Sequence, residues 1–293
     1  MRFEFMKNHA HEFSIEKMAQ ILGISRAGYY DFLKRKPSNI ALENQRLTGE
    51  IKKIHKESRG IYGSPRIHKE LKNKEEKCSR KRVAKLMRKE KIQSKIRKKW
   101  KTRKRKDDNL IMAVPNHLNQ NFLVETLNKV WASDITYIPT QEGWLYVAVV
   151  VDLFSRKIVG LSMGETLHTS LVINALNQAL VHRDVNVDLM HHSDRGSQYR
   201  SKEFSEFCNK HGIKLSMSAK GHCYDNAVVE SFFHTLKTEL THQCKYQIRE
   251  EAKNSIFEYI EVFYNRKRLH STIGYLSPVD FENNWTNKVK YAV

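Results

Sequence analysis

The chain has 293 residues and a formal net charge of +20, with 52 Lys and Arg against 32 Asp and Glu. At about 100–200 residues per domain, this length predicts two or three domains. No run of about 18 apolar residues occurs, which argues against a membrane span, and the first residues lack the apolar stretch of a secretory signal. The four cysteines form no C-x-x-C pair, so they predict neither a zinc ribbon nor a disulfide scaffold and are typical of a reducing cytoplasm.

The excess positive charge is confined to the first part of the chain. Residues 1–121 contain 33 Lys and Arg against 13 Asp and Glu, whereas residues 122–293 contain 19 of each. A basic part joined to a neutral part indicates one module that binds a polyanion and another with a different task. A cationic surface that serves only solubility is the alternative. A membrane-surface helix is disfavoured because no apolar anchor borders the basic helices.

Residues 14–36 have the pattern of a helix-turn-helix. Ser14 can cap a first helix, Gly23 can end it in the left-handed conformation, and Ser25 can cap a second helix with a basic end. We therefore assign residues 1–40 to a helix-turn-helix module that binds DNA. A purely structural helical hairpin would have the same pattern.

Residues 41–93 predict a second helical module that binds DNA. A helix is expected over about 42–57, and another begins at Ser64 as N-cap with Pro65 in the first helical position. Ser79 opens a third helix, whose outward basic side chains can contact phosphates while the helix lies in a groove. The residues expected to make these contacts are Arg82, Lys85 and Arg88.

Residues 94–121 predict a basic linker. Like charges as dense as those within residues 94–109 repel one another, so that run is expected to stay disordered until it meets DNA. Each Lys or Arg that displaces a counterion adds about 0.9 to the salt dependence of binding to duplex DNA. The linker residues expected to contact DNA are Lys98, Lys99, Arg103 and Arg105.

Residues 122–285 predict an α/β core with a helical and basic tail. Three strands separated by short turns indicate an antiparallel meander, and alternating helices and strands follow. The order βββ-α-β-α-β-α predicts a mixed sheet with helices on both faces. The strands are expected at residues 130–138, 145–153, 157–163, 188–193 and 214–218, and the helices at 169–182, 201–211, 226–240 and 250–264.

Three acidic residues lie at the ends of these elements. Asp134 lies in the first strand, Asp194 follows the fourth, and Glu230 lies in the first turns of the helix after the fifth. At one edge of the sheet, three carboxylates would repel one another unless divalent cations neutralised them, and oxygen ligands without His or Cys suit Mg²⁺ or Mn²⁺. Two such ions about 4 Å apart can activate a water and stabilise the leaving oxygen of a phosphodiester. From spacing alone, ordinary surface or capping acids remain an alternative.

The sequences around these acids resemble a known family. The motifs are WASDITY (131–137), HSDRGSQY (192–199), DNAVVESF (225–232), YGSPRI (62–67) and YNRKRLHSTIGY (264–275). In addition, 35 residues separate Asp194 from Glu230. With these features the chain resembles the transposases of the bacterial insertion-sequence three family, which have a retroviral-integrase-like core and a DD(35)E signature.

The resemblance implies a ribonuclease-H-like fold, with helix-turn-helix modules before it, and catalytic roles for the three acids. Asp134 and Asp194 would bridge two Mg²⁺ or Mn²⁺ ions, and Glu230 would hold the second ion. Lys237 matches a basic position of the family seven residues after Glu230, two helical turns along the same face, where it could contact DNA phosphate. Further expected DNA contacts are Arg195 and Arg268, although Arg268 could instead only solvate a helix end.

The resemblance also implies an activity. The family binds the terminal inverted repeats of an insertion sequence, cleaves the 3′ end with a divalent metal, and transfers the freed strand into DNA, working as a homo-oligomer on paired ends. An upstream-frame protein is often fused to it, and no zipper heptad of that protein is visible here. The expected location is the bacterial cytoplasm, on the nucleoid. A regulator that only binds DNA and a structure-selective nuclease resembling Holliday-junction resolvases remain alternatives.

Overall fold

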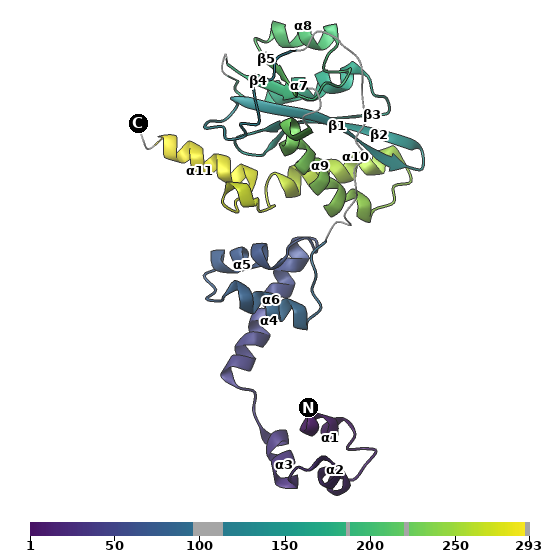
Figure 1. Ribbon diagram of the computed structural model, residues 1–293, viewed down its shortest axis with the longest axis vertical. Coiled ribbons are helices and arrows are strands. Elements are labelled where there is room, and N and C mark those ends of the chain that lie inside the picture. Colours follow the sequence, from purple (N-terminus) through teal and green to yellow (C-terminus); the bar gives the residue numbers. More distant parts are fainter. Residues whose placement is uncertain (96–113, 186–187, 220–222, 291–293) are drawn as a thin grey trace.

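The computed structural model describes residues 1–95, 114–185, 188–219 and 223–290. The chain forms three parts that follow one another along its length in Figure 1: a small helical module, a second helical module, and an α/β core at the top. No helix among the described residues is long and apolar enough to cross a membrane. The linker cations Lys98, Lys99, Arg103 and Arg105 lie outside the described residues.

The first module contains the predicted helix pair. The hydroxyl of Ser14 accepts a hydrogen bond from the backbone of its helix, as does that of Ser25, and Gly23 ends the first helix with φ of 61°. A preceding helix completes a small core around Met6 and Tyr29. The helices are α1 (Arg2–Asn8), α2 (Ile15–Leu22) and α3 (Arg26–Lys34).

The second module contains three helices, α4 (Asn39–Glu57), α5 (Ser64–Asn73) and α6 (Arg80–Lys89). The hydroxyl of Ser79 caps α6, as predicted. At α5 the N-cap is Gly63 rather than Ser64, so the predicted cap is wrong by one residue. Pro65 permits this shift, because the N–H groups of the first helical turn have no partner within the helix.

The core is built on a five-stranded mixed sheet with the order β3-β2-β1-β4-β5. The strands β1, β2 and β3 form the predicted antiparallel meander, whereas β1 pairs in parallel with β4 and β4 with β5. Their bounds are β1 (Val130–Thr140), β2 (Gly143–Asp152), β3 (Ile158–Gly164), β4 (Met190–Ser193) and β5 (Lys214–Met217). The predicted order of strands and helices is confirmed.

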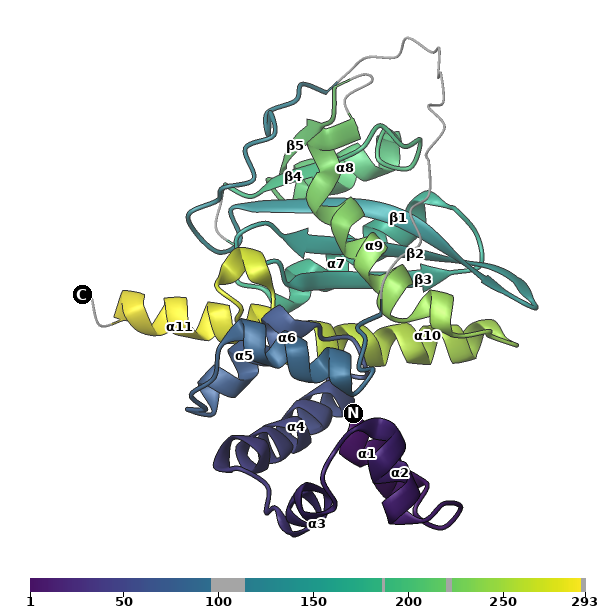
Figure 2. The same ribbon diagram turned by 60° about the horizontal axis from the view of Figure 1, so that its bottom comes forward.

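Helices cover both faces of the sheet, as Figures 1 and 2 show. On one face lie α7 (Thr169–His182) and α8 (Lys202–Lys210), and on the other α9 (Ala227–Glu239) and α10 (Arg249–Glu258), which continues as a π-helical turn. Alternate residues of β2 belong to the two hydrophobic clusters, so this strand is buried on both faces, as its unbroken apolar sequence predicts.

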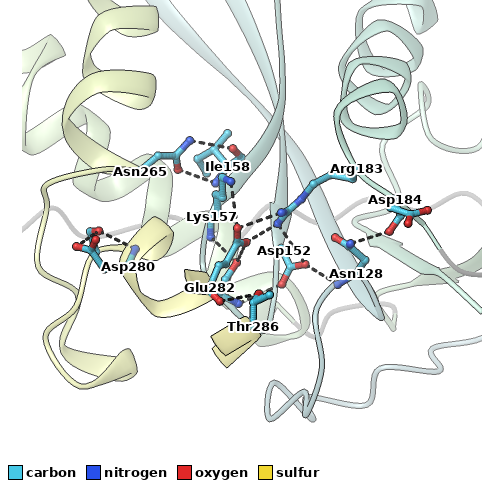
Figure 3. A network of polar contacts seen from close by, with 12 residues as sticks. Asn128, Asp152, Lys157, Ile158, Arg183, Asp184, Asn265, Asp280, Glu282 and Thr286 are labelled. Carbon is cyan, nitrogen blue, oxygen red and sulfur yellow. Dashed lines mark hydrogen bonds and ion pairs between the residues drawn. The ribbon is translucent and has the colours of Figure 1, made fainter. Parts of the chain in front are cut away.

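The last helix, α11 (Pro278–Lys290), is held to the core by a buried polar network (Figure 3). The carboxylate of Glu282 accepts from the hydroxyl of Ser155 (2.7 Å) and pairs with Lys157 (3.0 Å) and Arg183. At the end of β2, Asp152 is fully buried and accepts backbone hydrogen bonds from the following turn. Asp152 therefore has a structural role.

Two sequence motifs far apart in the chain meet where the second module packs on the core. The hydroxyl of Tyr62 donates to the carbonyl of Lys267 (3.1 Å) and accepts from the backbone N–H of Leu269 (2.8 Å). The guanidinium of Arg66 donates to the carbonyl of Leu269 (2.9 Å). Because one hydrophobic cluster also runs through both parts, α5 is anchored to the core by apolar and polar contacts together.

The described end of the expected linker is ordered against the core. Residues 114–121 pack on the core, where Leu118 is only 3% exposed. The side chains of Asn116 and Gln120 donate to the carboxylate of Asp225 just before α9. Residues 114–121 include no Lys or Arg, so the charge repulsion that predicts disorder in a basic run does not act on them.

Candidate active site

The register of β1 and β4 aligns two of the three acids. Ser133 pairs with Ser193 in the parallel ladder. The next residue in each case is an aspartate, Asp134 within β1 and Asp194 just after the end of β4, so the two lie at the same level of the sheet. One oxygen of each carboxylate is held by the backbone just after it, through the N–H of residue 135 (2.7 Å) and of residue 196 (2.9 Å).

The third acid is brought to this edge by the start of α9. The amide of Asn226 donates to the carbonyl of Ser133 (3.0 Å), which ties the beginning of the helix to β1 directly beside Asp134. Glu230 lies in the first turn of α9. Before the helix, Asp225 accepts hydrogen bonds from the segment 114–121 and from the backbone of residue 219. These contacts fix where α9 starts.

The three carboxyl groups influence one another. The pKa of Asp134 is raised to about 7, first by burial and then by the charges of Asp194 and Glu230, while the nearby N–H and Lys237 act in the opposite direction. Burial also raises the pKa of Asp194. Burial followed by the charge of Asp194 raises the pKa of Glu230. Negative charge is therefore costly at this edge, which is the electrostatic setting that a bound cation would relieve.

In the structure the three carboxylates are too far apart to bind one metal ion together. Within the described part of the chain, no three His, Cys, Asp or Glu side chains lie close enough together to hold a metal ion. Asp134 and Glu230 line a pocket of about 560 Å³ together with Lys237 and Thr136, whereas Asp194 lies outside it. The structure thus brings the three acids to one edge without closing them around a common point.

A buried polar layer lies behind the aspartates. His191 is hydrogen-bonded to the hydroxyl of Ser133 (2.7 Å), and His192 to two serines of the neighbouring strand and loop. Burial lowers the pKa of His191 to about 3 and that of His192 to about 4, so both are neutral. The buried hydroxyl of Tyr199 has no hydrogen-bond partner among the described residues. Tyr199 belongs to the motif HSDRGSQY, in which sequence reasoning considered the His, Asp and Arg but gave the Tyr no role.

The expected DNA contacts differ in their surroundings. Lys85 and Arg88 are exposed on α6. Arg82 is bound to the side chains of α4, and Arg195 donates to a backbone carbonyl (2.7 Å). The ammonium of Lys237 lies 5.2 Å from the centre of the Tyr137 ring, at the candidate active site. For Lys85, Arg88 and Lys237 the contact with phosphate stays a prediction.

Arg268 requires a correction. Its side chain is buried and donates two hydrogen bonds to Glu239 of α9 (2.7 and 2.8 Å), whose carboxylate also accepts from the hydroxyl of Tyr259 (2.6 Å). The guanidinium therefore has no exposed face for DNA, and it instead fixes α9 against the C-terminal segments. Sequence reasoning missed this pair because its members lie 29 residues apart and no local pattern links them.

Comparisons with known proteins assign the parts of the chain. Family models described as "Integrase core domain" match residues 125–223 and 230–285, and a model described as "HTH-like domain" matches residues 42–100. Together with the sheet topology, these matches confirm the predicted ribonuclease-H-like core and the helix-turn-helix-type module before it.

Relatives of similar length are known. The chain is 41% identical over 268 residues to an uncharacterised 31 kDa protein of insertion element IS600 from Shigella sonnei, covering 92% of this chain and 98% of that protein. It is 39% identical over 285 residues to the transposase InsF of insertion sequence IS3A from Escherichia coli, covering 97% of this chain and 99% of that protein.

Among solved structures, the catalytic core domain of HTLV-2 integrase, in complex with magnesium, matches 53% of this chain and 96% of its own length with a TM-score of 0.41 and 21% identity. The family is shown by the two transposable-element relatives, because each aligns over nearly its whole length. The chain belongs to the IS3 family of insertion-sequence transposases.

Proposed function

We propose that this chain is a DNA transposase that binds the terminal inverted repeats of its element, cleaves the 3′ end and joins the freed strand to DNA. The observation that carries the proposal is the alignment of Asp134 in β1 with Asp194 just after the adjacent parallel strand β4, with Glu230 in the first turn of α9 at the same edge. Burial and then the charge of Asp194 raise the pKa of both Asp134 and Glu230, a combination that favours a functional site over ordinary surface acids.

We propose that two divalent cations, Mg²⁺ or Mn²⁺, bind between these three residues. The donor set fits, since all three side chains offer carboxylate oxygen and all three have a raised pKa. Bound cations would supply Lewis-acid stabilisation of the attacking and leaving oxygens of a phosphodiester. Because the three carboxylates are not close enough for this in the structure, the proposal requires Glu230 and the aspartates to close on one another.

The chain's own residues would bind and orient the DNA. Lys85 and Arg88 on α6 would contact phosphates of the terminal repeat, and Lys237 would hold a phosphate beside the reacting one. In the first step a water oxygen bonds to phosphorus and the 3′ oxygen leaves. In the second step that 3′-hydroxyl bonds to another phosphorus and displaces a 3′ oxygen there. Both are in-line displacements that need no nucleophile from the protein.

We further propose that residues 1–40 and 41–93 hold the repeat and residues 122–285 perform the chemistry. The chain would work as a homo-oligomer on paired ends, on the DNA of the bacterial cytoplasm, with an upstream-frame protein fused or associated. These proposals rest on the family and on the confinement of the excess positive charge to residues 1–121.

The test is a joining assay. The protein is incubated with a labelled terminal-repeat duplex, a target plasmid, and Mg²⁺ or Mn²⁺, with and without the upstream-frame protein. Joined product is expected from the wild type and should fall at least about a thousandfold, by more than 4 kcal/mol of activation free energy, in Asp134→Asn and Glu230→Gln. Glu203→Gln, an exposed acid on α8, is the matched control and should retain the product.

The same assay separates the alternatives. Cleavage without joining would instead assign a structure-selective nuclease. Binding of the duplex with no product from the wild type under any condition would assign a regulator that only binds DNA. If both Asp134→Asn and Glu230→Gln still joined the strand, the reaction would not take place at this edge of the sheet.

A further inference from the structure

Two large aromatic side chains are exposed together at the hairpin of β1 and β2. Tyr137 is 57% exposed and Trp144 is 48% exposed. Their ring centres lie 5.0 Å apart at an interplanar angle of 85°, in the edge-to-face arrangement that aromatic pairs prefer. Single exposed apolar residues are common on protein surfaces, but adjoining ones that leave a shared ring surface in water mark binding sites.

The hairpin that carries these rings is held rigidly by α10. The guanidinium of Arg249 donates to the carbonyl of Trp144 (3.1 Å) and pairs with Glu165 (3.1 Å). The backbone N–H of Arg249 donates to the carboxylate of Glu142 in the turn itself (2.7 Å). The rings are therefore presented in a fixed position, which reduces the entropy lost when a ligand binds to them.

The aromatic pair adjoins the candidate active site. Lys237 lies over the Tyr137 ring and lines the same pocket as Asp134 and Glu230. Within the described chain, β4 pairs with β1 only as far as Ser133, so beyond that point this edge of β1 carries no ladder partner apart from an isolated bridge at Thr140. A strand of DNA could run along this open edge between the acids and the rings.

We propose that Tyr137 and Trp144 form a stacking site for an unpaired DNA base next to the reacting phosphate. The surface offers two exposed aromatic rings and a cation that lies over one of them, and a nucleotide offers the complementary base face and phosphate. Charge complementarity therefore favours a nucleic acid as the occupant over an apolar protein segment. The inference rests on the proposed function for the presence of the reacting phosphate, and it names how the neighbouring nucleotide is held.

Binding without chemistry tests the site. Fluorescence anisotropy in EDTA compares a twelve-nucleotide oligothymidylate with an abasic strand of equal length, which has the same phosphates but no bases. The wild type is expected to bind the thymidylate at least about tenfold more tightly, which is within the range for one stacked base. Trp144→Ala and Tyr137→Ala should each lose most of this preference, whereas Trp144→Phe should retain it. Phe257→Ala removes an equally exposed ring on α10 and should leave the preference unchanged.

Photocrosslinking locates the contact. A strand with 5-iododeoxyuridine is irradiated with the protein and digested with trypsin, which releases residues 130–156 as one peptide because Lys129 and Arg156 flank it. Adducts are expected on Tyr137 or Trp144. Adducts confined to other peptides, or an unchanged base preference in both alanine variants, would overturn the inference. So would a change of oligomeric state in Trp144→Ala, which would assign the rings to contact between copies.

Both measurements are made without a divalent metal. A failed joining assay with an intact base preference would therefore reject the proposed chemistry and leave the stacking site standing. Normal joining with no base preference would reject the stacking site alone.

Discussion

Asp134 shows how tertiary position changes the chemistry of one side chain. Its pKa is raised from 3.8 to about 7, first by burial and then by the charge of Asp194. The folded protein therefore binds this proton more tightly than the unfolded chain does. Stability contributed by the protonated form is fully present below pH 3.8 and is lost as the pH rises through about 7. Above that pH the ionised carboxylate is a cost to the fold.

Asp134→Asn should consequently stabilise the protein in the absence of divalent cations. At pH 8 we expect Tm to rise by at least about 2–4 °C, the shift that 1 kcal/mol produces in a protein of this size. The gain should shrink as the pH falls from 8 to 5. Thermal unfolding followed by circular dichroism measures both, with Glu203→Gln as the control that should not respond.

The same variant tests the cation. Millimolar Mg²⁺ should raise the Tm of the wild type, because an ion that binds only the folded state stabilises it, and should raise that of Asp134→Asn much less. An Asn variant that is less stable than the wild type at pH 8, or that responds to Mg²⁺ equally, would contradict this account.

At the scale of single elements, the contacts of α9 and α5 decide the geometry of the site. The start of α9 is tied to β1 through Asn226, and its end is fixed by the buried pair of Glu239 and Arg268. Breaking a buried pair by removing one partner typically costs about 3–5 kcal/mol. The second module reaches this same region through Tyr62, whose hydroxyl binds the residues on either side of Arg268.

Tyr62→Phe should therefore loosen the second module from the core. The change removes both hydrogen bonds of the hydroxyl and leaves the backbone N–H of Leu269 unpaired in a buried position, which costs about 1–3 kcal/mol. Urea unfolding measures the loss, and hydrogen exchange of the segment 264–277 should become faster. Tyr30→Phe, an exposed tyrosine of the first module, is the control and should change neither. Unchanged exchange at Leu269 would show that the apolar contacts alone hold the two parts together.

At the scale of the whole molecule, the excess positive charge and the candidate active site lie in different parts of the chain. The helical modules follow one another away from a core whose part of the sequence, residues 122–293, has no net charge (Figure 1). In the proposed transposase, long-range attraction for DNA would therefore come from residues 1–121, and the neutral core would meet the reacting phosphate with acids.

The salt dependence of DNA binding tests this division. Replacing both Lys85 and Arg88 by Ala should lower the slope of log K against log salt by about 2, since each phosphate contact contributes about 0.9. Both side chains are exposed, so the free energy of unfolding should change by less than about 0.5 kcal/mol each. Lys202→Ala on α8 is the control. An unchanged slope in the double variant would place the phosphate contacts elsewhere.

Features that depend on residues close together in the chain could be predicted from the sequence. The caps at Ser14, Ser25 and Ser79 and the alternation of strands and helices depend on interactions within a few residues, and the structure confirms them. The motifs around Asp134, Asp194 and Glu230 could likewise be recognised locally. The predicted start of α5 was wrong by one residue, because its N-cap is Gly63 and not Ser64.

Contacts between distant segments were decided only by the tertiary structure. Packing of the core aligns Ser133 with Ser193 in neighbouring strands. It also brings Arg268 to the carboxylate of Glu239, and the hydroxyl of Tyr62 to the backbone of Leu269. The physical reason is that a buried polar group needs a hydrogen-bond partner, and its partner is the group that the folded core brings near. The two can lie far apart in the chain. The sequence by itself thus determined which elements form and where the motifs with the three acids lie in them, and the fold determined how these elements face one another.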